Sequence, residues 1–163
     1  MSYADGPSVE VGRLIDAPIE RIWALVTDIN VAAQFSDEFL GAEWVDDGPA
    51  LGASFVGRNR HVALGQWETT SWVNRYEPLR VFGWAVGDPD IPSATWWFLL
   101  DHDQGGVRVR HGGRMGPAAS GLTAAIAARP DKEDRIIERR LGEWETNLAA
   151  TLEGIKQRAE VAP

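Results

Sequence analysis

The sequence predicts an α+β fold in which a seven-stranded antiparallel sheet wraps around a long C-terminal helix, with two short helices near the N-terminus. Two observations predict it. Strand-length segments separated by turn residues fill the middle of the chain, and one long amphipathic pattern fills its C-terminal part. The 163 residues suit one domain over residues 1–163, with flexible tails expected at 1–7 and 160–163.

The N-terminal part is expected to hold a strand and two short helices. Alternating side chains over Ser8–Ile15 indicate a strand. Pro18 fits the first turn of a helix, where its missing N–H costs nothing. A second short helix is expected at Val31–Phe35. The apolar residues that share one face of the first helix are Ile19, Ile22, Trp23 and Val26.

Six further strands are expected between residues 41 and 115. Turn signals such as Glu77-Pro78 and Gln104-Gly105 separate them. Because the connections are short, neighbouring strands should pair as antiparallel hairpins. The expected strands are Gly41–Asp46, Ala53–His61, Gly65–Glu77, Arg80–Val86, Ser93–Asp101 and Gly106–Met115.

The C-terminal part is expected to be helical. Leu122–Arg129 is a short Ala-rich piece that Pro130 interrupts, and Asp131–Glu160 follows with apolar residues at every third or fourth position. Acidic residues in the first turn of this second helix and basic residues in its last turn complement the helix dipole. At 1.5 Å per residue the helix is ~45 Å long, so it is the element able to cover one face of the sheet.

Composition excludes several classes of function. The formal net charge of −8 repels nucleic acid and anionic lipid surfaces. With no Cys and three His, we expect no metal and no cofactor. The chain shows no membrane span and no secretory signal, so we expect a cytoplasmic protein. Arg135, Arg139 and Arg140 lie among acidic residues, which predicts a solvated, salt-bridged helix face.

Five of the eight Trp residues lie between residues 67 and 97. They fit either a Trp-rich core or the lining of a cavity for an apolar ligand. Alternation predicts Trp84 and Trp97 on the inner face of the sheet and Trp96 on the outer face. An exposed Trp72 or Trp96 would mark an interaction surface, such as a homodimer interface.

Three polar side chains are candidates for an otherwise apolar cavity. His111 shares a strand phase with apolar residues such as Val109, which predicts an inward ring. It is either a core His with satisfied nitrogens or a pocket acid–base group or hydrogen-bond donor. His61 and Asn59 share the phase of Phe55. Asn59 is either an edge residue or a group that orients a ligand carbonyl.

The order of motifs along nearly the whole chain also points to a known superfamily. The motifs are Ile15-Asp16-Ala17-Pro18 with Trp23 and Asp28, then Gly52 to Asn59, Trp67 through Val73 to Glu77-Pro78, Phe82 with Trp84, and the C-terminal helix. In these the chain resembles the polyketide cyclase/dehydrase and START-like superfamily, also called SRPBCC, whose members share the helix-grip fold. The resemblance implies an internal pocket for lipids, sterols, polyketides or other hydrophobic metabolites.

Three functions remain open, because some members of that superfamily cyclise or dehydrate polyketides while others only bind ligands. The first is a carrier or binding protein for a small hydrophobic ligand. The second is a cyclase- or dehydratase-type enzyme in which His111 or His61 moves a proton and Asn59 polarises a carbonyl. The third is a stress-response protein-interaction module. The expected ligand-binding residues are Phe35, Phe55, Asn59, Trp67, Trp84, Trp97, Leu141 and Trp144.

Overall fold

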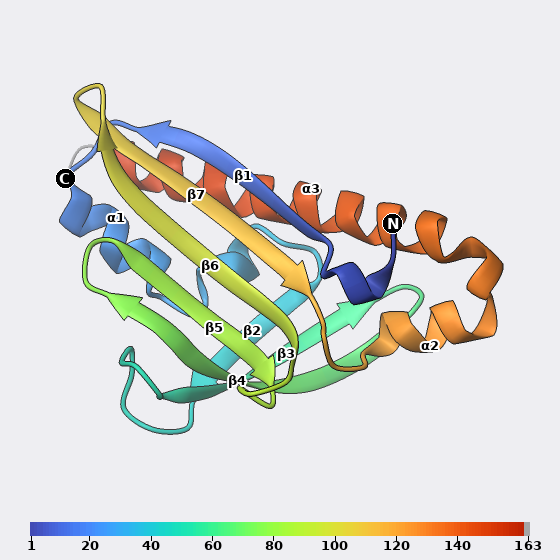
Figure 1. Ribbon diagram of the computed structural model, residues 1–163. Helices are drawn as coiled ribbons and strands as arrows, with labels where there is room; N and C mark the ends of the chain where they lie inside the picture. The colour runs from blue at the N-terminus through green and yellow to red at the C-terminus, as the bar shows by residue number, and fades with distance from the viewer. Residues whose placement is uncertain (162–163) are drawn as a thin grey trace.

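Seven antiparallel strands form one sheet in the order β1-β7-β6-β5-β4-β3-β2 (Figure 1). The computed structural model describes residues 1–161 and confirms the α+β helix-grip fold. The strands are β1 (Ser8–Ile15), β2 (Phe39–Trp44), β3 (Ser54–His61), β4 (Gly65–Glu77), β5 (Val81–Gly87), β6 (Pro92–Asp103) and β7 (Gly106–Met115).

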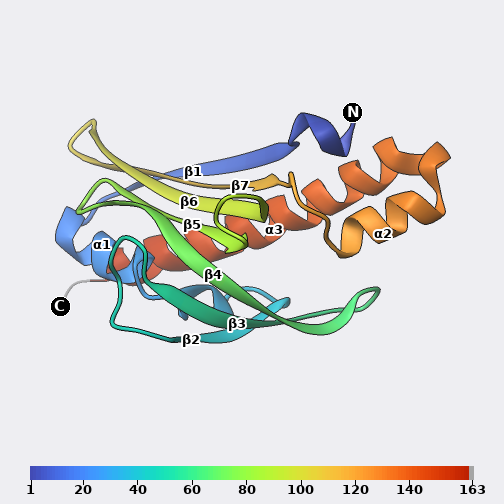
Figure 2. The same ribbon diagram turned by 60° about the horizontal axis from the view of Figure 1, so that its bottom comes forward.

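The helices lie at the two ends of the chain. Two short ones, α1 (Ile19–Val26) and η2 (Val31–Gln34), connect β1 to β2, as the sequence predicts. After β7 come α2 (Gly121–Ala128), the 3-10 turn η3 (Pro130–Lys132) and the long helix α3 (Glu133–Glu160). Figure 2 shows α3 running between β1 on one side and β2 and β3 on the other, so the sheet curls around it.

The hairpin between β6 and β7 determines which side chains of these two strands face inward. Gln104 and Gly105 form its two-residue turn with φ of 51° and 81°, the left-handed pair that matches the twist of an antiparallel hairpin. Asp103 therefore pairs with Gly106, and counting along both strands pairs Phe98 with His111. A one-residue slip would reverse the faces of every side chain in β6.

Strand β2 begins two residues earlier than expected. Phe39 pairs with Asn59, and the register then shifts before Gly41, whose φ is 137°. A glycine in a conformation that other residues rarely adopt allows this bulge.

Two clusters of buried residues lie between the sheet and α3. The larger contains Leu152 and Ile155 of α3, packed with residues of β1, α1, β6 and β7 such as Ile15 and Phe98. The smaller contains Ile137 and Trp144 of α3 with Ala94 and Met115. None of the helices within residues 1–161 combines the length and the apolar composition required to cross a membrane.

The first residues of the chain are anchored, contrary to the expectation of a flexible tail at 1–7. Tyr3–Asp5 forms the 3-10 helix η1. The Tyr3 hydroxyl donates to the carbonyl oxygen of Ala118 at 2.7 Å, and the Tyr3 N–H donates to Glu133 of α3 at 3.0 Å. At the other end, Glu160 still belongs to α3, and residues 162–163 of the second expected tail lie outside the described residues.

Candidate functional site

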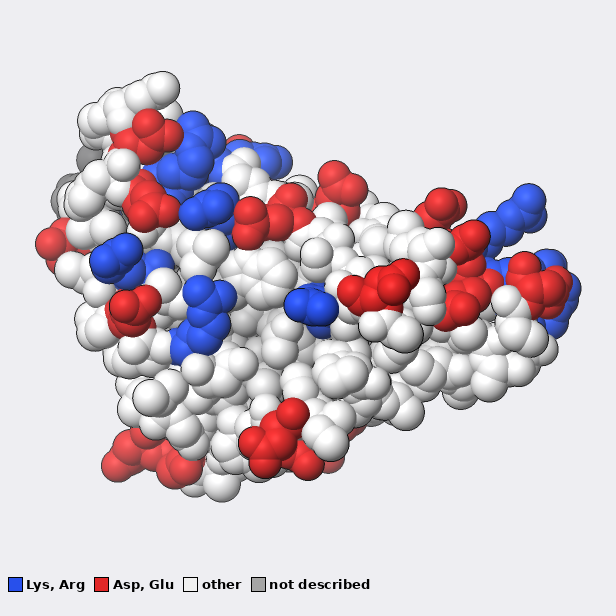
Figure 3. Space-filling view, viewed as in Figure 1, with Lys and Arg blue, Asp and Glu red and all other residues white. Residues whose placement is uncertain are grey.

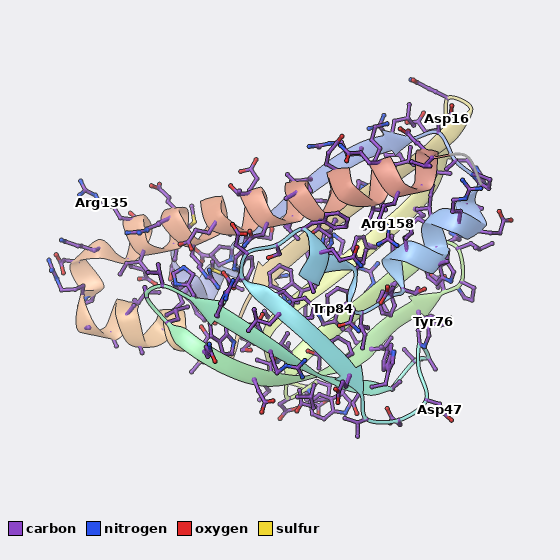
Figure 4. The ribbon with its side chains drawn as sticks, turned by 180° about the vertical axis from the view of Figure 1, so that it is seen from behind. Asp16, Asp47, Tyr76, Trp84, Arg135 and Arg158 are labelled. Carbon is purple, nitrogen blue, oxygen red and sulfur yellow. The ribbon has the colours of Figure 1, made fainter. Side chains whose placement is uncertain are left out.

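A cavity of about 500 Å³ lies between the inner face of the sheet and α3. Its volume is in the range of small-molecule sites. Figure 4 shows Trp84 pointing from the sheet toward α3. Six of the residues that the sequence predicts for the site line this cavity: Phe55, Asn59, Trp67, Trp84, His111 and Trp144.

Aromatic rings form much of the cavity wall. Trp84 is central, with its ring centroid 5.5 Å from that of Phe82, 6.0 Å from Phe55 and 6.3 Å from Phe98. Strand pairing places these rings side by side, since Trp84 and Phe82 of β5 pair with Trp96 and Phe98 of β6. Tilted and edge-to-face contacts of this kind stabilise aromatic clusters. The wall is therefore built by cross-strand neighbours rather than by residues adjacent in sequence.

Trp96, not Trp97, is the β6 tryptophan that faces the cavity. The Trp96 ring lies 4.3 Å from that of Trp144 on α3, measured between centroids. Trp97 points to the opposite face, where its indole N–H donates to Glu10 of β1 at 2.7 Å. Figure 3 shows the outer side of the sheet around β1 and β7, where acidic and basic side chains are interspersed.

The structure thus places Trp96 in the cavity lining and Trp97 on the outer face, the reverse of the expected arrangement. The alternation of β6 itself favours Trp96 inside, because its phase also holds Ala94, Phe98 and Leu100, whereas Ser93 and Thr95 share the phase of Trp97. The Gln104-Gly105 hairpin is a second signal for the same faces. It pairs the inward His111 with Phe98, which makes Phe98 and Trp96 inward as well.

Phe35 and Leu141 also lie outside the cavity lining. Phe35 packs against α3 at Gly154, where a Cβ atom added to the glycine would be 2.5 Å from the phenylalanine ring. Leu141 is half-buried and packs against the cluster that contains Ile137. Both residues support α3. The α3 residues that face the cavity instead are Arg140, Trp144, Asn147, Leu148 and Thr151.

His111 is the most deeply buried ionisable group of the site. Its ring is stacked on Phe98, with centroids 3.8 Å apart and planes 6° apart, and the residue is 5% exposed. Nδ1 lies 3.0 Å from the carbonyl oxygen of Trp97. Burial lowers the pKa of His111 to about 4, although the bond to this carbonyl acts in the opposite direction. The imidazole is therefore neutral at pH 7.

The bond to Trp97 also determines the tautomer of His111. A carbonyl oxygen only accepts, so Nδ1 carries the proton and Nε2 has a free lone pair. Within residues 1–161 no buried side-chain nitrogen or oxygen lacks a partner. Because the structure gives Nε2 no partner there, this atom must be open to the cavity that the ring lines. His111 thus offers the cavity a hydrogen-bond acceptor.

Most of the other polar groups that line the cavity are neutral. Asn59 lies on β3 opposite Trp67 of β4 and lines the cavity as predicted. Thr69 and Ser71 follow on the same face of β4, and Thr151 faces them from α3. A small number of polar groups within apolar walls is typical of sites that orient a ligand.

His61 lies beside the cavity rather than in it, in an adjoining open groove. The Ala63 N–H donates to its Nδ1 at 3.0 Å, so Nε2 carries the proton and donates to Glu143 of α3. The structure therefore places His61 outside the cavity in which it was expected to move a proton. His61 is the last residue of β3 and still points toward α3, where it contacts Glu143, but it lies past the end of the cavity.

Arg140 is buried, in contrast to the solvated helix face expected for it. It is 8% exposed, and its guanidinium donates to both oxygens of Glu38, at 2.8 and 2.7 Å. A third bond of 3.4 Å reaches Glu143. The sequence could not reveal this pair, because 102 residues separate Arg140 from Glu38.

The ligand atoms of Glu38, His61 and Glu143 all lie within 4.8 Å of one another, a spacing that a metal ion can use. However, Arg140 already bonds both carboxylates, and His61 donates rather than accepts. These contacts form a closed ion-pair network at the edge of the cavity. The two carboxylates and the imidazole are therefore better suited to this ion-pair network than to binding a metal ion.

Comparisons with known proteins agree with the geometry. The polyketide cyclase/dehydrase and lipid transport family matches residues 7–160. The solution structure of the polyketide-cyclase-like protein Cgl2372 from Corynebacterium glutamicum is 32% identical, with a TM-score of 0.67 over 94% of this chain and 91% of that one.

More distant structures share the fold. The di-domain ARO/CYC protein BexL of the BE-7585A biosynthetic pathway is 17% identical, with a TM-score of 0.72 over 96% of this chain and 51% of its own. The di-domain ARO/CYC protein StfQ of the steffimycin pathway is 12% identical, with a TM-score of 0.71 over 94% and 50%. This chain therefore spans about half of each. A comparison with curated proteins found no match. On the match over residues 7–160, the chain belongs to the polyketide cyclase/dehydrase and lipid transport family.

Proposed function

We propose that the protein binds a small, neutral, hydrophobic metabolite in the cavity between the sheet and α3. The observation that carries this proposal is the cavity of about 500 Å³, whose lining includes Trp84, Trp96, Trp144 and Phe98. Burying a flat apolar molecule against such rings is favourable by about 25 cal/mol for each Å² removed from water.

Charge supports a neutral ligand. Two carboxylates, of Asp28 and Glu38, and one guanidinium, of Arg140, line the cavity within the described residues. The guanidinium is already bonded to both oxygens of Glu38. An anionic ligand would therefore meet no free cation there, and a cationic one would lose its hydration against mostly apolar walls.

Binding without catalysis is favoured over the cyclase or dehydratase alternative by the state of His111. A general base works best when its pKa is near the working pH. Burial brings the pKa of His111 to about 4, which makes it a weak base at pH 7. The protein-interaction alternative loses one of its two marker residues, because Trp96 is inside.

Native mass spectrometry of the protein purified from its own host tests the proposal. We expect an added mass from a bound small molecule. Trp96 and Trp97 provide a matched pair of variants, since they are adjacent on β6 and face opposite sides. Trp96→Ala should lose the added mass and weaken rebinding of the extracted ligand by at least about tenfold. Trp97→Ala should retain the added mass and the wild-type affinity for the extracted ligand.

Two results would contradict the proposal. One is wild-type protein that carries no small molecule and gives no heat when titrated with neutral naphthalene-type compounds. The other is equal loss of the ligand in the two variants, which would show that a general loss of stability, and not the cavity wall, is responsible. Circular dichroism confirms that both variants are folded before either result is used.

A further inference from the structure

The acceptor on His111 restricts which neutral ligand the cavity takes. Nε2 is the free nitrogen of a ring that is otherwise stacked on Phe98 and bonded to Trp97. A polar atom that faces an apolar space without a partner costs about 1–3 kcal/mol, and a matching ligand group removes this penalty. A site of this kind discriminates against ligands that lack the matching group.

The surroundings of Nε2 specify the rest of the ligand. His111 pairs with Phe98 across the strands, and the neighbouring inward residue of β6 is Trp96, which pairs with Trp84. A group bonded to Nε2 is therefore attached to a part of the ligand that lies along these rings. Flat aromatic molecules suit such a wall because they can pack against it face to face or edge to face.

We infer that the ligand is an aromatic molecule bearing a hydroxyl group, and that this hydroxyl donates a hydrogen bond to Nε2 of His111. The inference rests on the proposed function and assigns His111 as the residue that selects the ligand. A ligand carbonyl or ether oxygen at the same place would face a lone pair rather than a donor. Ketones and methyl ethers are therefore disfavoured at this position.

A set of matched probes tests the inference by isothermal titration calorimetry. The probes are 2-naphthol, 2-methoxynaphthalene, whose oxygen cannot donate, and naphthalene, which has no oxygen. We expect the wild-type protein to bind 2-naphthol about tenfold more tightly than either of the other two, the ratio that one neutral hydrogen bond supplies. The ratio should be the same at pH 7.5 and pH 6, because the imidazole is neutral at both values.

Two variants of His111 distinguish the hydrogen bond from ring packing. His111→Phe keeps a flat ring beside Phe98 but has no acceptor, and we expect it to bind all three probes with similar affinity. His111→Gln has a side-chain oxygen that can accept, and we expect it to recover part of the preference for 2-naphthol. Trp97→Ala, on the outer face, should retain the full wild-type preference.

Each remaining outcome has a distinct meaning. If the wild-type protein binds the three probes equally, the inference is wrong while the proposed function stands. If 2-methoxynaphthalene binds more tightly than 2-naphthol, His111 acts as a donor and the tautomer assignment is wrong. If no probe binds, the proposed function fails for aromatic ligands and the inference fails with it.

Discussion

His111 shows how two neighbours determine the chemistry of one side chain. Burial keeps the imidazole neutral, and the carbonyl of Trp97 holds the proton on Nδ1. The ring nitrogen that remains is an acceptor in a cavity whose lining includes several Trp and Phe side chains. Its role is thus decided by which atom the backbone has already used, and not by the usual ability of histidine to donate and accept.

The lowered pKa of His111 makes stability depend on pH in a defined direction. The group has a pKa of about 4 when folded and about 6.5 when unfolded. Its contribution is complete above pH 6.5 and is lost as the pH falls through 4, because the unfolded chain binds the proton more readily. The full difference is about 3 kcal/mol.

We expect the free energy of unfolding of the wild-type protein to fall by about 2 to 3 kcal/mol more than that of His111→Phe between pH 7.5 and pH 4.5. Urea unfolding at both pH values measures the two differences. Parallel pH profiles for the two proteins would contradict the assignment. So would an NMR titration of the imidazole with a midpoint near 6.5.

At the scale of the element, α3 has a different role at each end. Its C-terminal half packs tightly, with Leu152 and Ile155 fully buried. The preceding turns face the cavity through residues such as Trp144 and Thr151. The surroundings of two glycines within the helix differ in the same way. Gly154 lies against the ring of Phe35, whereas nothing lies within 4 Å of a Cβ atom added to Gly142.

Alanine should therefore have opposite effects at these two positions of one helix. Gly142→Ala should raise the free energy of unfolding by about 0.5–1 kcal/mol, since alanine is the better helix former. Gly154→Ala should lower it by about 1–3 kcal/mol, because its Cβ would meet the Phe35 ring at 2.5 Å. Urea unfolding measures both. A stabilising Gly154→Ala would show that Phe35 moves aside freely.

At the scale of the whole molecule, one buried ion pair joins parts of the chain that are distant in sequence. Glu38 precedes β2, which is an edge strand of the sheet, and Arg140 lies on α3. Their bidentate contact ties this edge to the helix beside the cavity. Removing one partner leaves the other charge in a poorly hydrated place, which is more costly than removing both.

Arg140→Met alone should lower the free energy of unfolding by about 2–4 kcal/mol, because it leaves Glu38 without its partner. The double variant Glu38→Leu/Arg140→Met should be more stable than Arg140→Met. A double-mutant cycle from urea unfolding measures this coupling. Additive effects of the two substitutions would show that the pair contributes no interaction of its own.

The sequence alone determined the order and type of the elements. Alternation and helical spacing are local properties, and they predicted the seven strands, the two short N-terminal helices and the long C-terminal helix. His111, in a strand with one clearly apolar phase, was also placed correctly, and so was Trp84, which shares its phase with Phe82. These patterns sufficed because burial of one face directly selects the residues on it.

Only the tertiary structure decided which groups meet. The contact between Trp96 and Trp144 joins β6 to α3 and depends on how the helix packs against the sheet. The burial of Arg140 depended on Glu38, which is far away in the chain. The acceptor on His111 depended on a backbone carbonyl of the neighbouring strand. In each case strand pairing or helix packing brings in a partner that determines the contact, the burial or the hydrogen-bonding role of the side chain. Local sequence patterns do not reveal that partner.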